Sequence, residues 1–170
     1  MTNIIIKKSN KKNIAFLYFN KKKIICLVGK NGIGNKCREG DMITPRGVFK
    51  MSKIYYRYDK IGKINTKIPS QKISKKLIWI TDPKSKKYNS PSIQNSSHNF
   101  ENFHRNDNIY DIVIVVNFNF SPCKKFKGSA IFIHCTEKNK NFTEGCIAVK
   151  KEVLIEMLKY ISPKSFLIVN

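Results

Sequence analysis

His134 and Cys146 are the two side chains whose types and spacing are best suited to covalent chemistry. The histidine ends an apolar run at 131–133, and the cysteine, preceded by Gly145, opens a second apolar run after a short polar loop. Neighbouring strands would bring the imidazole and the thiol into hydrogen-bonding reach. A histidine that takes the thiol proton leaves a thiolate, which attacks a carbonyl carbon. The pattern therefore indicates acyl transfer, and Gly145 supports it because a residue without a Cβ lets backbone N–H groups approach a developing oxyanion.

The same pair also has a purely structural interpretation. Free cysteine is among the most often buried residue types, and a histidine at the end of a strand is often a hydrogen-bonded core residue. A single cysteine with a histidine elsewhere in the chain is a weak signal. Spacing alone therefore leaves both interpretations open.

Length and composition indicate one globular domain over residues 1–170. A chain of this length can bury a core, and its hydrophobic fraction of 41% lies well above that of disordered proteins. The longest apolar runs, 112–116 and 131–133, are strand-sized and far shorter than the roughly 20 residues that span a bilayer. No transmembrane segment is expected, and the first residues carry no recognisable secretory signal.

The net charge of +22 comes almost entirely from lysine. Arginine is scarce, whereas proteins that read nucleic acid rely on arginine for bidentate and stacking contacts. Abundant Lys, Asn and Ile are typical of an AT-rich coding sequence, which explains the charge without a nucleic-acid partner. The charge still favours salt-sensitive association with anionic polymers.

The cysteines argue against a disulfide framework and against a structural zinc site. They are odd in number and contain no C-x-x-C pair: Cys26, Cys37, Cys123, Cys135 and Cys146. Cys135 directly follows His134, and adjacent residues of a strand point to opposite faces, so these two side chains are not expected to share a site. The sequence therefore predicts no metal centre.

Apolar runs separated by Asn- and Lys-rich turns predict strands over most of the chain. These runs are 4–6, 14–19, 24–28, 48–58, 109–118, 129–135 and 166–169. One helix is predicted over 150–161, where apolar residues recur at helical spacing before Ser162-Pro163 ends it. Residues from about 59 to 108 form an irregular, loop-rich insertion, typical of a substrate loop or of a disordered segment. The expected fold is mainly β (β-rich α+β), with a C-terminal helix beside the cysteine strand.

Further motifs occur in an order known from one family. They are Arg38-Glu39-Gly40-Asp41, Thr44-Pro45-Arg46-Gly47, Trp79 with Asp82-Pro83 and Tyr88-Asn89, Ser97-His98, Tyr110-Asp111, the run from Ser129 to His134, and Thr143-Glu144-Gly145-Cys146. From about residue 24 to the C-terminus they resemble the L,D-transpeptidase catalytic domain, the YkuD/ErfK superfamily. The resemblance implies a β-sandwich or open barrel, a cysteine nucleophile and no cofactor.

The resemblance also implies a reaction and its partners. Such a protein cuts a peptide bond in a peptidoglycan stem, holds the acyl group as a thioester and passes it to an amine. Cys146 would be the nucleophile, His134 the base, and the Cys135 carbonyl the group that orients His134. The backbone N–H groups of Gly145 and Cys146 would form the oxyanion hole. The partners would be donor and acceptor stem peptides and, electrostatically, anionic envelope polymers, in the periplasm or cell envelope.

Residues that bind substrate follow from the same resemblance. The candidates are Arg38, Arg46, Trp79, Tyr88, His98, Thr143 and Glu144. Guanidinium groups bind carboxylates bidentately, which favours the two arginines as carboxylate ligands. Trp79 would line the groove or anchor the core, and His98 would supply a second polar group or a loop contact.

The chain departs from the family pattern at two positions. Glu144 stands where the usual S-H-G-C motif has histidine, and Ala148 stands where Arg or Asn is common. The base role therefore rests on His134. Two other functions remain open: an L,D-carboxypeptidase or peptidoglycan amidase with water as acceptor, and a non-catalytic basic domain that binds an anionic polymer.

Overall fold

The computed structural model describes residues 2–94 and 98–170 of the chain. Ser97, the first residue of the Ser97-His98 motif, lies outside the described residues. Strands dominate and helix makes up 7% of the structure, which confirms the expected mainly β fold. None of the helices in the described ranges is both long and apolar enough to cross a membrane.

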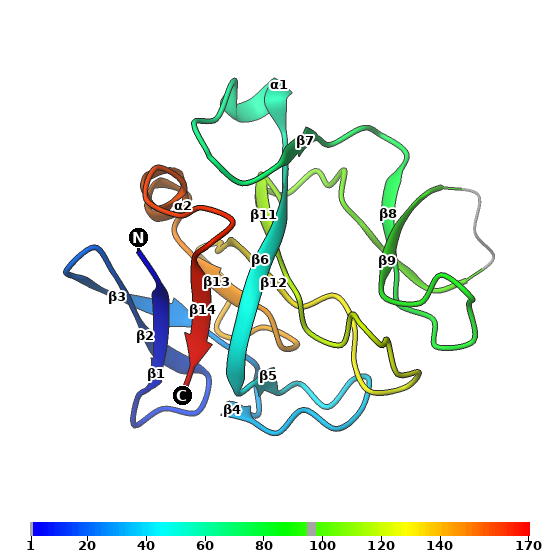
Figure 1. Cartoon of the computed structure of the whole chain (residues 1–170), viewed down its shortest axis with the longest axis horizontal. Coiled ribbons are helices and arrows are strands. Elements are labelled where there is room, and N and C mark those ends of the chain that lie inside the picture. The colour runs from blue at the N-terminus through cyan, green and yellow to red at the C-terminus, as the bar shows by residue number, and fades with distance from the viewer. Residues whose placement is uncertain (1, 95–97) are drawn as a thin grey trace.

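A large nine-stranded sheet closes on itself into a barrel-like structure (Figure 1). Its strands, in spatial order, are β11 (Ile112–Val116), β12 (Phe132–Cys135), β13 (Ile147–Val149), β3 (Lys22–Leu27), β2 (Ile14–Phe19), β1 (Ile4–Lys8), β14 (Phe166–Val169), β6 (Gly47–Tyr56) and β7 (Ser70–Lys72). The sheet closes because β6 also pairs with β11. The ten-residue length of β6 allows this, since its first part pairs with β14 and its second part with β11 and β7.

The parallel pairing of β12 with β13 decides where the candidate catalytic residues lie. In its register Ile133 is opposite Ile147, and His134 is opposite Ala148. Parallel neighbours cannot be joined by a tight hairpin, so the connecting segment 136–146 must run back along the sheet. A bridge between Gly29 and Thr143 fixes this connection to the loop that follows β3.

Two smaller sheets complete the β-structure. One contains β10 (Phe100–Asn102), β8 (Leu77–Ile80) and β9 (Ser90–Ile93), and the other pairs β4 (Ile33–Gly34) with β5 (Thr44–Pro45). In Figure 1 the β8 and β9 strands lie on the side of β6 away from β1, β2 and β3. The stretch 59–108, expected to be irregular, thus contains four short strands, β7 to β10. Its strands are short and flanked by polar turns, which hides their periodicity in the sequence.

The helices are shorter than the main strands. The predicted helix at 150–161 is α2 (Lys151–Leu158), which directly follows β13, and α1 (Tyr58–Ile61) is a single turn that the sequence pattern did not predict. Leu154, Met157 and Leu158 are the buried residues of α2. They pack into the same core as the closed sheet and so fix the cysteine strand from its C-terminal end.

Strand alternation divides the interior into two cores. On β11, Ile112 and Ile114 face the core of the closed sheet, whereas Val113 and Val115 face a second core. The second core is rich in aromatic residues and joins the β8 sheet to the large sheet. Its buried members are Tyr55, Ile73, Leu77, Trp79, Phe103, Tyr110, Val113, Val115 and Phe132, with Cys146 packed against it.

Candidate active site

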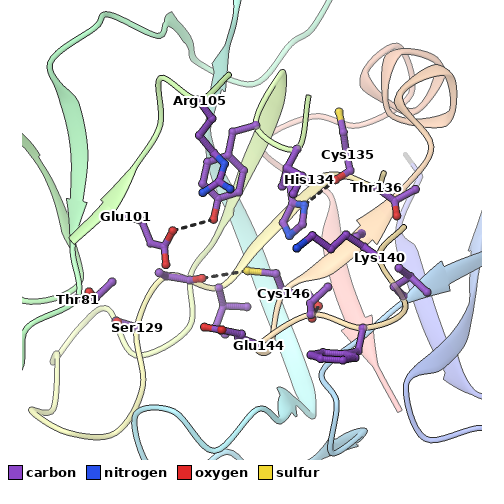
Figure 2. Close-up of a pocket in the computed structure, with 18 of the residues that line it drawn as sticks. Thr81, Glu101, Arg105, Ser129, His134, Cys135, Thr136, Lys140, Glu144 and Cys146 are labelled. Carbon is purple, nitrogen blue, oxygen red and sulfur yellow. Dashed lines mark hydrogen bonds between the residues drawn. The ribbon is translucent and has the colours of Figure 1, made fainter. Parts of the chain in front are cut away.

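A pocket of about 680 Å³ lies over the outer face of the β12–β13 pair. His134, Cys146 and Ala148 are among its lining residues. The parallel register places His134 beside Ala148, and alternation puts Cys146 on the same face of the neighbouring strand, two residues earlier. Figure 2 shows the imidazole and the thiol entering this pocket from adjacent strands. The two candidate catalytic side chains therefore share one cavity.

The His134 imidazole is oriented by the backbone. Its Nδ1 lies 2.8 Å from the carbonyl oxygen of Cys135, the contact that the resemblance implies. A carbonyl oxygen only accepts hydrogen bonds, so Nδ1 carries the proton and Nε2 keeps its lone pair. Burial lowers the pKa of His134 to about 4, and the Tyr110 ring packs against it edge-on at 5.4 Å between centroids. The imidazole is therefore neutral near pH 7 and able to accept a proton at Nε2.

The Cys146 thiol is held by two backbone groups. It donates to the carbonyl oxygen of Ala130 at 3.1 Å and accepts from the Phe132 N–H at 3.3 Å. Ala130 has a φ of +52°, an uncommon conformation for a non-glycine residue. Burial raises the pKa of Cys146 to about 12, and the negative charges of Glu101 and Glu144 act in the same direction. The resting site thus pairs a neutral thiol with a neutral imidazole.

The Thr143-Glu144-Gly145-Cys146 turn is tied together through one hydroxyl. Thr143 Oγ1 donates to the Cys146 carbonyl oxygen at 2.6 Å and accepts from the Gly145 N–H at 3.2 Å. One of the two N–H groups expected in the oxyanion hole is therefore occupied within the turn. Gly145 has a φ of +140°, and a Cβ there would lie 2.9 Å from the Ile43 carbonyl oxygen. Only glycine fits this approach without displacing backbone.

The Thr44-Pro45-Arg46-Gly47 motif supports the cysteine turn through its threonine. Thr44 is fully buried, and its Oγ1 accepts from the Gly29 N–H at 2.8 Å and donates to the Cys146 carbonyl oxygen at 3.4 Å. Arg46 of the same motif is exposed and does not line the pocket. The motif therefore positions the turn, and the expectation that Arg46 binds substrate has no structural support.

The Arg38-Glu39-Gly40-Asp41 motif has a similar supporting role. Asp41 accepts hydrogen bonds from Lys36 Nζ at 2.5 Å and from the backbone N–H of Cys37 at 2.9 Å, which fixes the loop. Glu39 lines the pocket and accepts from the Ser129 hydroxyl at 3.0 Å. Arg38 is exposed and lies outside the pocket, so its expected contact with substrate is not supported.

Two expected groove residues belong to the interior instead. Trp79 is 2% exposed, stacks on Phe103, and donates from Nε1 to Asn89 Oδ1 at 3.1 Å, so it anchors the aromatic core. Tyr88 is also buried; its hydroxyl donates to Glu39 Oε2 and accepts from the Gly128 N–H at 3.0 Å. Neither lines the pocket, because their large apolar rings are more stable in the core than at its rim.

Of the three remaining candidates, two line the pocket and one makes a contact in a surface loop. Thr143 and Glu144 line the pocket. His98 does not, and its Nδ1 lies 2.8 Å from Asp82 Oδ2 in a surface pair. Within residues 2–94 and 98–170 no group of three or more His, Cys, Asp or Glu side chains is placed to hold a metal ion.

Glu101, Arg105 and Lys140 line the pocket but were not predicted from the sequence. Glu101 is half-buried, burial raises its pKa, and the Tyr110 hydroxyl donates to its Oε2 at 3.4 Å. The Arg105 guanidinium lies 5.2 Å from the centre of the Tyr110 ring, and Lys140 comes from the connection between β12 and β13. Glu101 and Arg105 lie far in sequence from the two catalytic motifs, and Lys140 lies in the polar loop between them, so no local pattern identifies them.

Comparison with known families gives one match that covers nearly the whole chain. The family model of the L,D-transpeptidase catalytic domain (YkuD) matches residues 2–169. No curated protein matches the chain in sequence.

Solved structures match this chain over nearly its whole length at low sequence identity. Bd1075 from Bdellovibrio bacteriovorus has a TM-score of 0.50 and 13% identity, over 99% of this chain and 47% of that one. An L,D-transpeptidase from Mycobacterium smegmatis has a TM-score of 0.42 and 12% identity, over 99% of this chain and 59% of that one. For L,D-transpeptidase 1 from Mycobacterium tuberculosis the values are 0.41, 12%, 99% and 62%. The chain thus spans about half to three-fifths of the length of these proteins.

Proposed function

This chain belongs to the L,D-transpeptidase catalytic-domain family (YkuD), and we propose that it crosslinks peptidoglycan stem peptides through a thioester on Cys146. The observation that carries the proposal is the shared pocket of Cys146 and His134 on adjacent parallel strands. A thiol, a neutral base and an orienting carbonyl are the groups that acyl transfer requires. The donor and acceptor stem peptides are the proposed partners.

In the acylation half, His134 Nε2 takes the proton of Cys146 as Sγ attacks the carbonyl carbon of the donor's scissile amide. The tetrahedral intermediate collapses when the C–N bond breaks, and His134 returns the proton to the leaving amine. The products of this half are the shortened peptide, held as a thioester on Cys146, and the released C-terminal fragment that carries the free amine. The hydrogen bond from Nδ1 to the Cys135 carbonyl supports this role, because it keeps Nε2 free for both proton transfers.

In the second half, an amine of the acceptor peptide attacks the thioester carbonyl. His134 takes a proton from this amine, the C–S bond breaks, and the proton passes to the departing Cys146 thiolate. The net result is a new amide bond and a regenerated thiol. The proposal requires the acceptor amine to react faster than water.

The resting protonation states bear on how the reaction begins. Burial raises the pKa of Cys146 to about 12, so the thiol is protonated at pH 7. A preformed thiolate–imidazolium pair is therefore not the starting state, and proton transfer accompanies attack on the bound carbonyl. The thiol must also turn its proton from the Ala130 carbonyl towards His134.

The oxyanion would be stabilised at the start of β13. The backbone N–H of Cys146 is one proposed donor. The Gly145 N–H is the second, and it would exchange its 3.2 Å hydrogen bond to Thr143 Oγ1 for one to the oxyanion when substrate binds. The absence of a Cβ at Gly145 supports this, since the substrate carbonyl must come close to the backbone.

Muropeptide analysis tests the proposed function. Purified protein, Cys146→Ala and His134→Ala are each incubated with disaccharide-tetrapeptides, and the products are separated and weighed. Crosslinked dimers made by the wild type and by neither variant are the expected result. Shortened monomers without dimers would identify a hydrolase, and unchanged substrate with folded protein would contradict catalysis on these peptides.

A further inference from the structure

The strand that follows the nucleophile brings no positive charge into the pocket. Ala148 lies on the same face as Cys146, is 3% exposed and presents only a methyl group to the pocket lining. A peptide substrate carries at least one free carboxylate. The positive charge that binds this carboxylate must therefore come from another part of the pocket wall.

Two of the pocket's basic side chains are already engaged. Lys36 is paired with Asp41 at 2.5 Å, and both side chains are almost fully buried. Arg105 pairs with Asp107 at 2.6 Å, and its guanidinium lies over the Tyr110 ring. These ion pairs neutralise both groups and tie them to the scaffold.

Lys140 is the basic residue of the pocket wall whose ammonium has no such partner. Within residues 2–94 and 98–170 no ion pair and no side-chain hydrogen bond engages its Nζ, while its backbone N–H donates to the Glu137 carbonyl oxygen at 3.2 Å. Lys140 lies in the 136–146 connection and is exposed. Figure 2 shows its side chain extending over the pocket on the His134 side. An unpaired ammonium thus faces the cavity that contains the thiol.

The charge on the other side of the pocket has the opposite sign. Glu101 and Glu144 line the pocket, and Figure 2 shows Cys146 between Glu101 on one side and Lys140 on the other. A substrate carboxylate is repelled from the Glu101 side and attracted to the Lys140 side. Glu137 lines the pocket from the same connection as Lys140, but its Oε1 accepts from the Asn108 N–H at 2.9 Å, so among the described residues the Lys140 ammonium is the unpaired positive charge on that side of the nucleophile.

We infer that Lys140 binds a free carboxylate of the donor peptide and so orients the scissile carbonyl over Cys146. The inference rests on the proposed function, since it concerns the substrate of the same pocket. Lys140 supplies from the β12–β13 connection the positive charge that Ala148 cannot supply from the strand. It is a residue of specificity and orientation, and it takes no part in proton transfer.

Lys138 offers a matched control. It lies in the same connection, is also exposed, and does not line the pocket. Lys138→Ala and Lys140→Ala remove the same charge from the same loop, so a general electrostatic effect would change both equally. Lys140→Arg keeps the charge and is expected to restore binding.

The test compares a stem tetrapeptide that has free carboxylates with the same peptide fully amidated. In acylation assays we expect Lys140→Ala to raise KM for the free peptide by about five- to tenfold, with kcat little changed. The amidated peptide should show no such difference, and Lys138→Ala should match the wild type with both. Equal KM values for Lys140→Ala and Lys138→Ala with the free peptide would overturn the inference.

A binding measurement separates this inference from the proposed reaction. Calorimetry with the same peptides on Cys146→Ala protein, with and without Lys140→Ala, needs no turnover. Weaker binding of the free peptide to the double variant supports the role of Lys140 even if no crosslinking is ever seen. Identical affinities, or no binding of the free peptide to Cys146→Ala, would contradict the role of Lys140 independently of catalysis.

Discussion

The two faces of the β12–β13 pair each carry a cysteine, Cys135 fully buried and Cys146 half-buried, in different surroundings. Cys135 points into the core of the closed sheet and is 1% exposed, whereas Cys146 reaches the pocket. Burial raises the pKa of both thiols to about 12. Burial thus acts on both thiols in the same direction, and the difference between them lies in what surrounds them. Access to a cavity and the His134 imidazole on the same face distinguish Cys146, and alternation along the strand provides both.

The largest expected effect follows from removing each thiol in turn. Cys146→Ala should lower acylation by at least about 10³-fold, because no other group replaces the nucleophile. Cys135→Ala should keep most of the activity, since His134 contacts the backbone carbonyl of residue 135 and not its sulphur. Crosslinking rates of the two variants measure the contrast, and similar losses in both would remove the functional distinction between the faces.

Replacing the proposed base is expected to have the next largest effect. His134→Gln should reduce acylation by about 10²- to 10⁴-fold, because Cys146 then loses its proton acceptor. Single-turnover acylation of this variant provides the measurement, with circular dichroism as the check on folding. A variant that acylates at the wild-type rate would show that another group takes the thiol proton.

Substitution of Gly145 tests whether stability and acylation depend on the close backbone approach at this turn. Gly145→Ala should destabilise the protein by about 1–3 kcal/mol and impair acylation, because the new Cβ would lie 2.9 Å from the Ile43 carbonyl oxygen at a φ of +140°. Gly62→Ala is the matched control, since Gly62 also has a positive φ, of +66°, but nothing lies within 4 Å of an added Cβ. Urea denaturation and activity are measured for both. Equal losses would mean that backbone strain alone, and not the close approach, matters at Gly145.

The last expected effect concerns the pH dependence of stability, which tests whether His134 is neutral in the folded protein. The pKa of His134 falls from 6.5 to about 4 on folding, so the unfolded chain binds this proton more tightly. Its contribution to stability is fully present above pH 6.5 and is lost as pH falls through 4, up to about 3 kcal/mol. Denaturation of the wild type and His134→Gln at pH 7 and pH 4.5 measures it. The wild type should lose more stability than the variant, and parallel losses would contradict a buried neutral imidazole.

Much of the fold could be predicted from the sequence because apolar runs and polar turns alternate clearly. The strand predicted at 166–169 coincides with β14, and the helix predicted at 150–161 contains α2. The closure of the sheet could not be predicted, since it depends on the pairing of β6 with β11, which are far apart in the chain. The strands within 59–108 were missed because each is only three or four residues long.

The candidate site was predictable only in part. The strand pattern indicated His134 and Cys146 because chemistry and periodicity coincide there. Trp79 shows the limit of such arguments, because the same indole can line a groove or fill a core, and only tertiary packing decides which. Lys140 could not be predicted, because its place at the pocket depends on the path of the 136–146 connection, and no sequence motif marks it.

The most direct test of the account is the intact mass of the protein after brief incubation with a donor tetrapeptide and no acceptor. We expect an added mass equal to the acyl part of the donor, located on Cys146 after digestion and absent from Cys146→Ala. Cys37 and Cys123, the exposed cysteines, should stay unmodified. No adduct on a folded protein that cleaves the donor, or an adduct that persists in Cys146→Ala, would contradict a thioester on Cys146.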